Sequence, residues 1–104
     1  MTEGNDTYNS GEPGIGLEAA RWLIDQDIVA VGADNWGIEV HPPPNPNRPI
    51  EVHQWMITKS GIYVVENLNL EEIAAGGVHE FAFMFAPLRL KGATGSPGNP
   101  ISVR

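Results

Sequence analysis

The spacing of apolar and polar positions predicts alternating helices and strands along the first two thirds of the chain. Residues 17–26 carry an imperfect helical stripe of apolar side chains among good helix formers. Residues 28–33 form a continuous apolar run rich in β-branched residues, which is typical of a strand buried on both faces in a parallel sheet. The stretch 52–68 then predicts a short helix, a turn at Gly61 and a second buried strand at residues 62–65.

The last third of the chain continues the alternation. Asn69 is a candidate N-cap for a short helix that the glycine pair at 76–77 should end. Residues 80–86 place three phenylalanines on one face of a third strand, and residues 101–103 could form a last short strand. The order helix–strand–helix–strand–helix–strand predicts an α/β fold with three main buried strands and intervening helices.

Length and loop content indicate a single domain over residues 1–104. A chain of 104 residues can bury one modest core. Residues 1–13 are predicted to be an irregular lead with a Gly-Glu-Pro-Gly turn signal. The proline-rich segment 41–49 and the segment 92–100 are predicted to be surface loops, because proline removes a hydrogen-bond donor and fixes φ.

Charge and hydropathy exclude several classes of partner. The net charge of −7 argues against nucleic acid, whose phosphates require a basic surface. The sequence has neither a basic amphipathic helix nor an apolar run long enough to span a bilayer, so no membrane contact is expected. The N-terminus lacks the features of a signal peptide, and the sequence contains no cysteine. A cytoplasmic location is the default expectation.

His53 and Glu66 are the first candidates for chemistry. His53 lies in the first turn of the predicted helix, and Glu66 follows the strand at residues 62–65. An imidazole nitrogen and a carboxylate oxygen together suit zinc, manganese or iron(II). A separation of 13 positions is no recognised local motif, so the residues alone favour a surface histidine and a solvated glutamate.

Other polar and aromatic residues offer weaker signals. Asp34 ends the strand at residues 28–33, where ligands of α/β sheets gather, but turn chemistry explains it equally well. Trp36 could line a pocket, although core packing is the more common role. The loop around Thr94 could offer amides and hydroxyls to an anion, although most such loops are only loops. His41 and His79 are expected to be solvated loop residues.

A set of segments, taken together and in order, carries more information than any of these residues singly. The segments are 10–16, 19–23, 31–37, 52–54, 61–63, 66–68 and 86–97. In this order they resemble the carboxyl-terminal part of the cyclase family of metal-dependent hydrolases, which includes bacterial kynurenine formamidase and isatin hydrolase. The resemblance covers nearly the whole chain from about residue 8.

The resemblance implies a fold, a reaction and a cofactor. The fold would be part of the swivelling β/β/α kind, and the reaction would be hydrolysis of an amide or lactam C–N bond in a small-molecule substrate. One or two divalent ions, zinc or manganese, would be bound, and a full-length enzyme of this family is expected to be a homo-oligomer. His53 and Glu66 match the family's late histidine and glutamate ligands, while Asp34, Trp36 and Thr94 would shape the substrate pocket.

The sequence departs from the family in one large respect. The family's signature H-x-G-T-H-x-D-x-P-x-H, which would supply most metal ligands, is absent from this sequence. The ligands would then come from a missing amino-terminal half or a partner chain, and two ligands alone would hold a catalytic metal weakly. Three explanations stay open, namely a truncated product, an excerpt of a longer chain, or a subunit completed by another chain; the irregular lead favours the first two. A non-catalytic remnant or assembly module is the alternative function.

Overall fold

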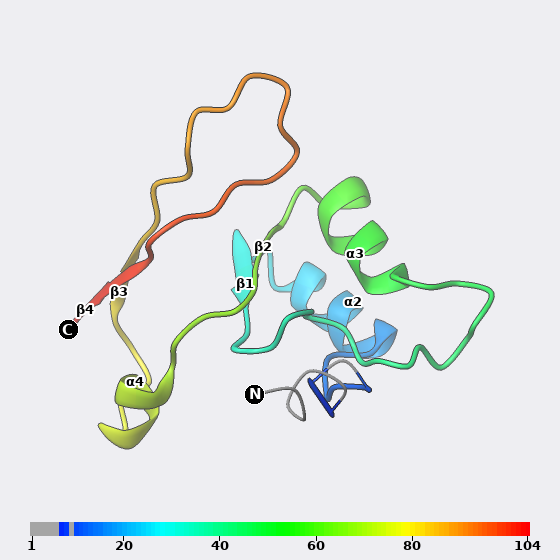
Figure 1. The fold of residues 1–104 in the computed structure, drawn as a ribbon, viewed down its shortest axis with the longest axis horizontal. Coiled ribbons are helices and arrows are strands. Elements are labelled where there is room, and N and C mark those ends of the chain that lie inside the picture. The colour runs from blue at the N-terminus through cyan, green and yellow to red at the C-terminus, as the bar shows by residue number, and fades with distance from the viewer. Residues whose placement is uncertain (1–6, 9) are drawn as a thin grey trace. The chain divides into compact units, whose positions relative to one another are not determined.

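The computed structural model describes residues 7, 8 and 10–104, whose helices and strands are shown in Figure 1. Of the irregular lead predicted for residues 1–13, residues 1–6 and 9 lie outside the described residues. The chain divides into two compact units, the first ending at Leu68 and the second beginning at Asn69. Its mixture of helices and strands is consistent with the predicted α/β class.

Helix α2 (Leu17–Asp25) forms where the apolar stripe of residues 17–26 predicts a helix. Ala20 is fully buried, and Leu23 packs against the core. The apolar stripe also includes Trp22, but the structure leaves this side chain 62% exposed. Trp22 lies two positions after Ala20 and therefore points roughly 200° away around the helix axis.

Strands β1 (Ala30–Gly32) and β2 (Tyr63–Val65) pair in parallel, with Ala30 opposite Tyr63. A parallel pair requires a long crossover, and the chain between the two strands contains the helical segment that provides it. The parallel kind of sheet predicted from residues 28–33 is therefore present. The prediction that these strands are buried on both faces is wrong, because Val29 is 75% and Tyr63 is 71% exposed.

The helix of the crossover has two parts with different winding. Helix α3 (Glu51–His53) continues directly into the π-helix η1 (Gln54–Lys59). The short helix predicted after Val52 is therefore present, but most of it has the wider π turn. π-Helices are rare and occur frequently at functional sites. His53 is the last residue of α3, next to this change of winding.

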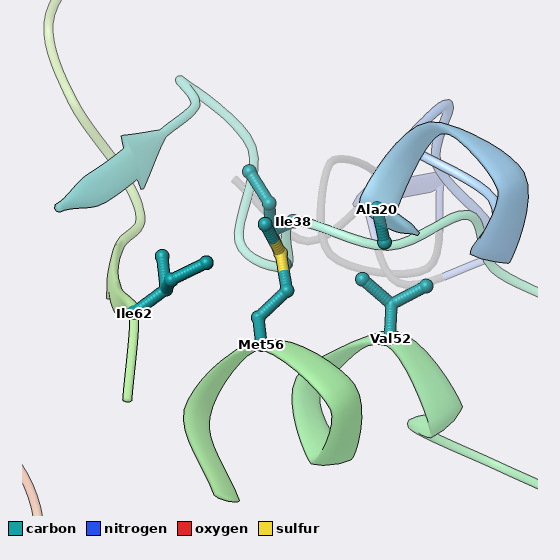
Figure 2. Close-up of a cluster of buried hydrophobic side chains, with 5 residues drawn as sticks. All are labelled: Ala20, Ile38, Val52, Met56 and Ile62. Atoms are coloured by element: carbon teal, nitrogen blue, oxygen red, sulfur yellow. The ribbon is translucent and has the colours of Figure 1, made fainter. Parts of the chain in front are cut away.

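The described residues of the first unit contribute five buried apolar side chains to its core. They are Ala20, Ile38, Val52, Met56 and Ile62. Figure 2 shows the Met56 side chain pointing from η1 toward Ile38, and Val52 of α3 pointing toward Ala20 of α2. Of the residues that the structure describes, Met56 has the largest fully buried side chain. Since burial of apolar area is the main favourable term in folding, this cluster holds α3 and η1 against α2 and the segment that contains Ile38.

The second unit begins with helix α4 (Glu71–Ala75). The structure places Leu70 at the N-cap, so the prediction that Asn69 caps this helix is wrong by one residue. The side-chain oxygen of Asn69 accepts the backbone N–H of Glu71 at 3.3 Å from the position before the cap. The helix ends at Gly76, and Gly77 adopts a φ of +60°, in the left-handed region that favours glycine. The glycine pair therefore ends the helix as predicted.

Strands β3 (Ala82–Met84) and β4 (Ile101–Val103) form an antiparallel pair within the second unit. Both strands lie where the sequence predicts them. The prediction of a third buried strand is wrong, because Phe83 is 44% and Met84 is 51% exposed. A two-stranded ribbon is too thin to bury its own side chains, so the apolar pattern of residues 80–86 does not form a core among the described residues of this unit.

Candidate functional site

His53 lies between two carboxylates. Its ring Nδ1 lies 3.0 Å from Glu39 Oε2, and its Nε2 lies 3.0 Å from Glu66 Oε1. The side chains of His53, Glu39 and Glu66 are 24%, 12% and 28% exposed. Partial shielding from water strengthens hydrogen bonds between charged groups. These three side chains form a carboxylate–imidazole–carboxylate group, the His53 cluster.

Backbone N–H groups hold both carboxylates of the His53 cluster in place. Glu39 Oε2 also accepts the backbone N–H of His53, at 3.1 Å. Glu66 Oε1 accepts the backbone N–H of Ile38, at 2.8 Å. Because Ile38 belongs to the hydrophobic core, the position of Glu66 is tied to the best-packed part of the unit.

Three segments far apart in the sequence bring the His53 cluster together. Glu39 lies on an extended segment that bridges to the start of the chain, through Ile15 opposite Glu39 and Glu12 opposite His41. Glu66 directly follows β2, and His53 ends α3. Glu12 contributes a third carboxylate nearby, whose Oε2 accepts the backbone N–H of Gly37 at 3.3 Å. The site therefore depends on tertiary packing of the whole first unit.

The two carboxylates raise the pKa of His53. Burial of the ring lowers its pKa, but the hydrogen bonds to Glu39 and Glu66, together with the negative charges of the same two groups, outweigh this effect. The pKa of His53 in the folded chain is therefore above its usual value of 6.5. The charged imidazolium is the form that can donate a hydrogen bond to both carboxylates at once.

A pH dependence of stability follows from this shift. Since the folded-state pKa of His53 exceeds its unfolded value of 6.5, the stabilisation is fully present below about pH 6.5 and is lost as the pH rises through the folded-state pKa. We expect the free energy of unfolding of the wild type to decrease over that interval relative to His53→Gln. Urea unfolding at a series of pH values measures it. A variant of the exposed His79, His79→Gln, serves as the control, and identical curves for wild type and His53→Gln would contradict the assignment.

The distance between His53 and Glu66 fits a pair of metal ligands. Two atoms bound to one zinc ion at roughly 2.0–2.1 Å lie about 2.9–3.4 Å apart when the angle between them is between 90° and tetrahedral. The observed 3.0 Å between Nε2 and Oε1 lies in this interval. Within residues 7, 8 and 10–104, no group of three or more His, Asp or Glu side chains is arranged to hold a metal ion. The pair therefore fits as part of a coordination shell and would need further ligands.

The three residues predicted to bind substrate lie at different places in the fold. Asp34 is exposed in the bend after β1. Trp36 is partly buried, its Nε1–H donates to the carbonyl oxygen of Tyr8 at 3.2 Å, and its ring meets that of His41 edge-on at 5.6 Å. Thr94 is exposed in the second unit. Their contact with a substrate stays a prediction.

Glu39 is the member of the His53 cluster that the sequence does not point to. It lies 14 positions before His53, and no local motif joins the two. One signal was present, because Glu39 is an acidic residue between two β-branched residues, Ile38 and Val40, in a segment that is otherwise apolar. An acid at such a position often has a specific partner, since a partly buried carboxylate without one is costly.

No helix in the described part of the chain is both long and apolar enough to cross a bilayer. The expected cytoplasmic location stays a prediction.

Comparison with known proteins identifies two similarities. The family model described as Putative cyclase matches residues 2–40. A solved structure described as the crystal structure of a novel cyclase has 36% sequence identity to this chain and a TM-score of 0.76. The similarity covers 90% of this chain and 31% of that chain. No curated protein matches the sequence.

Both similarities support the cyclase family for this chain. The structural match extends beyond residues 2–40 and includes most of the chain, so it is not limited to one segment. At 36% identity, a TM-score of 0.76 also supports the arrangement of helices and strands described above. The chain spans about a third of the length of the solved cyclase.

Proposed function

We propose that this chain supplies one side of the metal site of a cyclase-family, metal-dependent hydrolase. His53 Nε2 and Glu66 Oε1 would bind one divalent ion, zinc or manganese. The remaining ligands would come from outside the described residues, either from an amino-terminal half or from a partner chain. The observation that carries the proposal is the 3.0 Å approach of these two atoms from separate elements, a helix and the end of a strand.

The proposed reaction is hydrolysis of an amide or lactam C–N bond, as in kynurenine formamidase. A divalent ion, when bound, polarises a carbonyl group and lowers the pKa of a water molecule. The residues of this chain would hold that ion, and Asp34, Trp36 and Thr94 would contact the small-molecule substrate. Support for the reaction class comes from the family similarity together with the nitrogen and oxygen donors of the His53 cluster.

A manganese titration of the 104-residue chain, followed by NMR, tests the ligand assignment. Mn²⁺ is paramagnetic and broadens the resonances of nearby nuclei, so even an incomplete, weak site is detected. We expect the resonances of His53 and Glu66 to broaden before those of other acidic residues, and a chelator to reverse the effect. The physical reason is that two preorganised ligands bind more tightly than isolated surface carboxylates.

The matched variants are His53→Ala and His79→Ala. The first should lose the early broadening around Glu66, and the second should retain it because His79 is exposed in a loop of the second unit. Equal broadening in the two variants, or none in the wild type, would show that His53 is not a ligand.

A non-catalytic assembly module is the second candidate function, and the exposure of apolar side chains in the second unit favours it. The side chains concerned are Phe83, Met84, Leu88, Leu90, Ile101 and Val103, each 44–57% exposed. Exposed apolar groups of this kind mark interaction surfaces. The proposed partner is a polypeptide that supplies the part of the cyclase fold for which this chain has no counterpart. A negative manganese titration would favour this candidate over the hydrolase.

A further inference from the structure

One oxygen atom of Glu39 makes two hydrogen bonds with the same residue. Oε2 accepts the backbone N–H of His53 at 3.1 Å and lies 3.0 Å from Nδ1 of the His53 ring. A group that bonds both the backbone and the ring of one residue restricts both side-chain torsions of that residue. The ring of His53 is thereby turned so that its opposite nitrogen, Nε2, faces Glu66.

The two carboxylates compete for the single proton of the neutral imidazole. Glu39 has the advantage, because its side chain is 12% exposed while that of Glu66 is 28% exposed. A hydrogen bond to a charged group is stronger where water is excluded. Each of the two oxygens also accepts one backbone N–H, and the bond from Ile38 to Glu66 Oε1, at 2.8 Å, is shorter than the bond from His53 to Glu39 Oε2, at 3.1 Å. The proton of the neutral ring is therefore expected on Nδ1, which leaves a lone pair on Nε2.

We infer that Glu39 is a positioning residue that sets both the orientation and the protonated nitrogen of His53. Glu39 holds the proton on Nδ1 and presents the Nε2 lone pair toward Glu66. A metal-ligating histidine commonly donates its other ring N–H to a carboxylate, which orients the ring and increases its basicity. The use of Nε2 as a metal ligand rests on the proposed function, whereas the control of the ring by Glu39 does not.

A purely structural role for Glu39 predicts a different result. If Glu39 only anchored the backbone N–H of His53, its removal would lower stability and leave the ring proton where it was. If Glu39 sets the ring, its removal should transfer the proton of the neutral ring to Nε2, where Glu66 remains as the acceptor. The two roles are therefore distinguished by which ring nitrogen of His53 carries the proton, because both roles predict a loss of stability.

The test is a set of ¹⁵N–¹H correlation spectra of the histidine rings in the metal-free 104-residue chain, at a pH where the ring of His53 is neutral. We expect the proton on Nδ1 in the wild type and on Nε2 in Glu39→Ala. Glu39→Gln keeps an oxygen acceptor at the same place, so it should retain the proton on Nδ1. Glu51→Ala is the matched control, because Glu51 is also on α3 but pairs with Arg48.

Two results would overturn the inference. One is a proton on Nε2 of the neutral His53 ring in the wild type. This measurement requires no variant, so it can be made even if Glu39→Ala does not fold. The other is a folded Glu39→Ala chain whose ring proton stays on Nδ1.

The metal titration separates this inference from the proposed function. Zn²⁺ affinity at the His53 cluster should fall about 10–100-fold in Glu39→Ala and remain unchanged in Glu51→Ala. A Glu39-dependent ring proton without Mn²⁺ or Zn²⁺ binding would support the positioning role and count against the metal site. If the chain binds metal but the ring proton of His53 does not depend on Glu39, the metal site is supported and the positioning role is contradicted.

Discussion

Replacement of Met56 by alanine is expected to destabilise the chain by about 2–5 kcal/mol. Met56 is fully buried, and it belongs to a core of five apolar residues. Truncation removes its apolar contacts and leaves a cavity between η1 and Ile38. In a small core, few neighbouring side chains can move to fill that cavity. Urea unfolding followed by circular dichroism should show a midpoint shifted far toward lower urea concentration.

The control for this prediction is the neighbouring residue in the same π-helix. Ile57 is 48% exposed, so Ile57→Ala should change the free energy of unfolding much less. Comparable losses in the two variants would mean that the core does not lie where the structure places it. Native domains are stable by only about 5–15 kcal/mol, so the Met56 effect would be a large fraction of the total.

The order of helices and strands could be predicted from the sequence because it depends on local patterns. The apolar run at residues 28–33 and the glycine pair at 76–77 each carry their signal within a few positions. Burial could not be predicted in the same way. The side chains of Phe83 and Met84 are apolar in any context, but whether they are covered depends on which segments pack there, and that is a tertiary property.

The candidate site could be predicted only in part, for a related reason. His53 and Glu66 were candidates from their residue types and positions, and the family resemblance favoured them as metal ligands. The structure brings His53 Nε2 to 3.0 Å from Glu66 Oε1. Glu39 was missed because it reaches the site through an extended segment paired with Ile15, a contact between positions far apart in the sequence. Spacing along the sequence does not report such a contact, while the three-dimensional arrangement makes Glu39 the best-shielded carboxylate of the cluster.

Gly14→Ala should affect both the stability of the chain and the geometry of the His53 cluster. A Cβ atom at Gly14 would collide with the backbone of Glu39 and would lie 2.5 Å from the backbone nitrogen of Val40. Backbone atoms cannot turn away as a flexible side chain can, so the segment 38–40 must shift. This segment contains Ile38 of the core and Glu39 of the cluster. We expect a loss of about 1–3 kcal/mol in the free energy of unfolding, typical of overpacking, with a displaced His53 ring resonance.

Gly16→Ala provides a matched control two positions away. A Cβ at Gly16 would meet no atom within 4 Å, and the residue has an extended backbone conformation before α2 that alanine can adopt. Alanine is less favourable than glycine at an N-cap, but it also reduces the conformational entropy of the unfolded chain, which stabilises by about 0.4–1 kcal/mol. The two effects oppose each other, so Gly16→Ala should lower the free energy of unfolding less than Gly14→Ala does. Urea unfolding measures the change in stability of both variants, and the ¹⁵N–¹H spectra of the histidine rings show whether the His53 ring has moved. If Gly14→Ala leaves the His53 resonance unchanged, the segment 38–40 does not position Glu39, and the link between the fold and the cluster is lost.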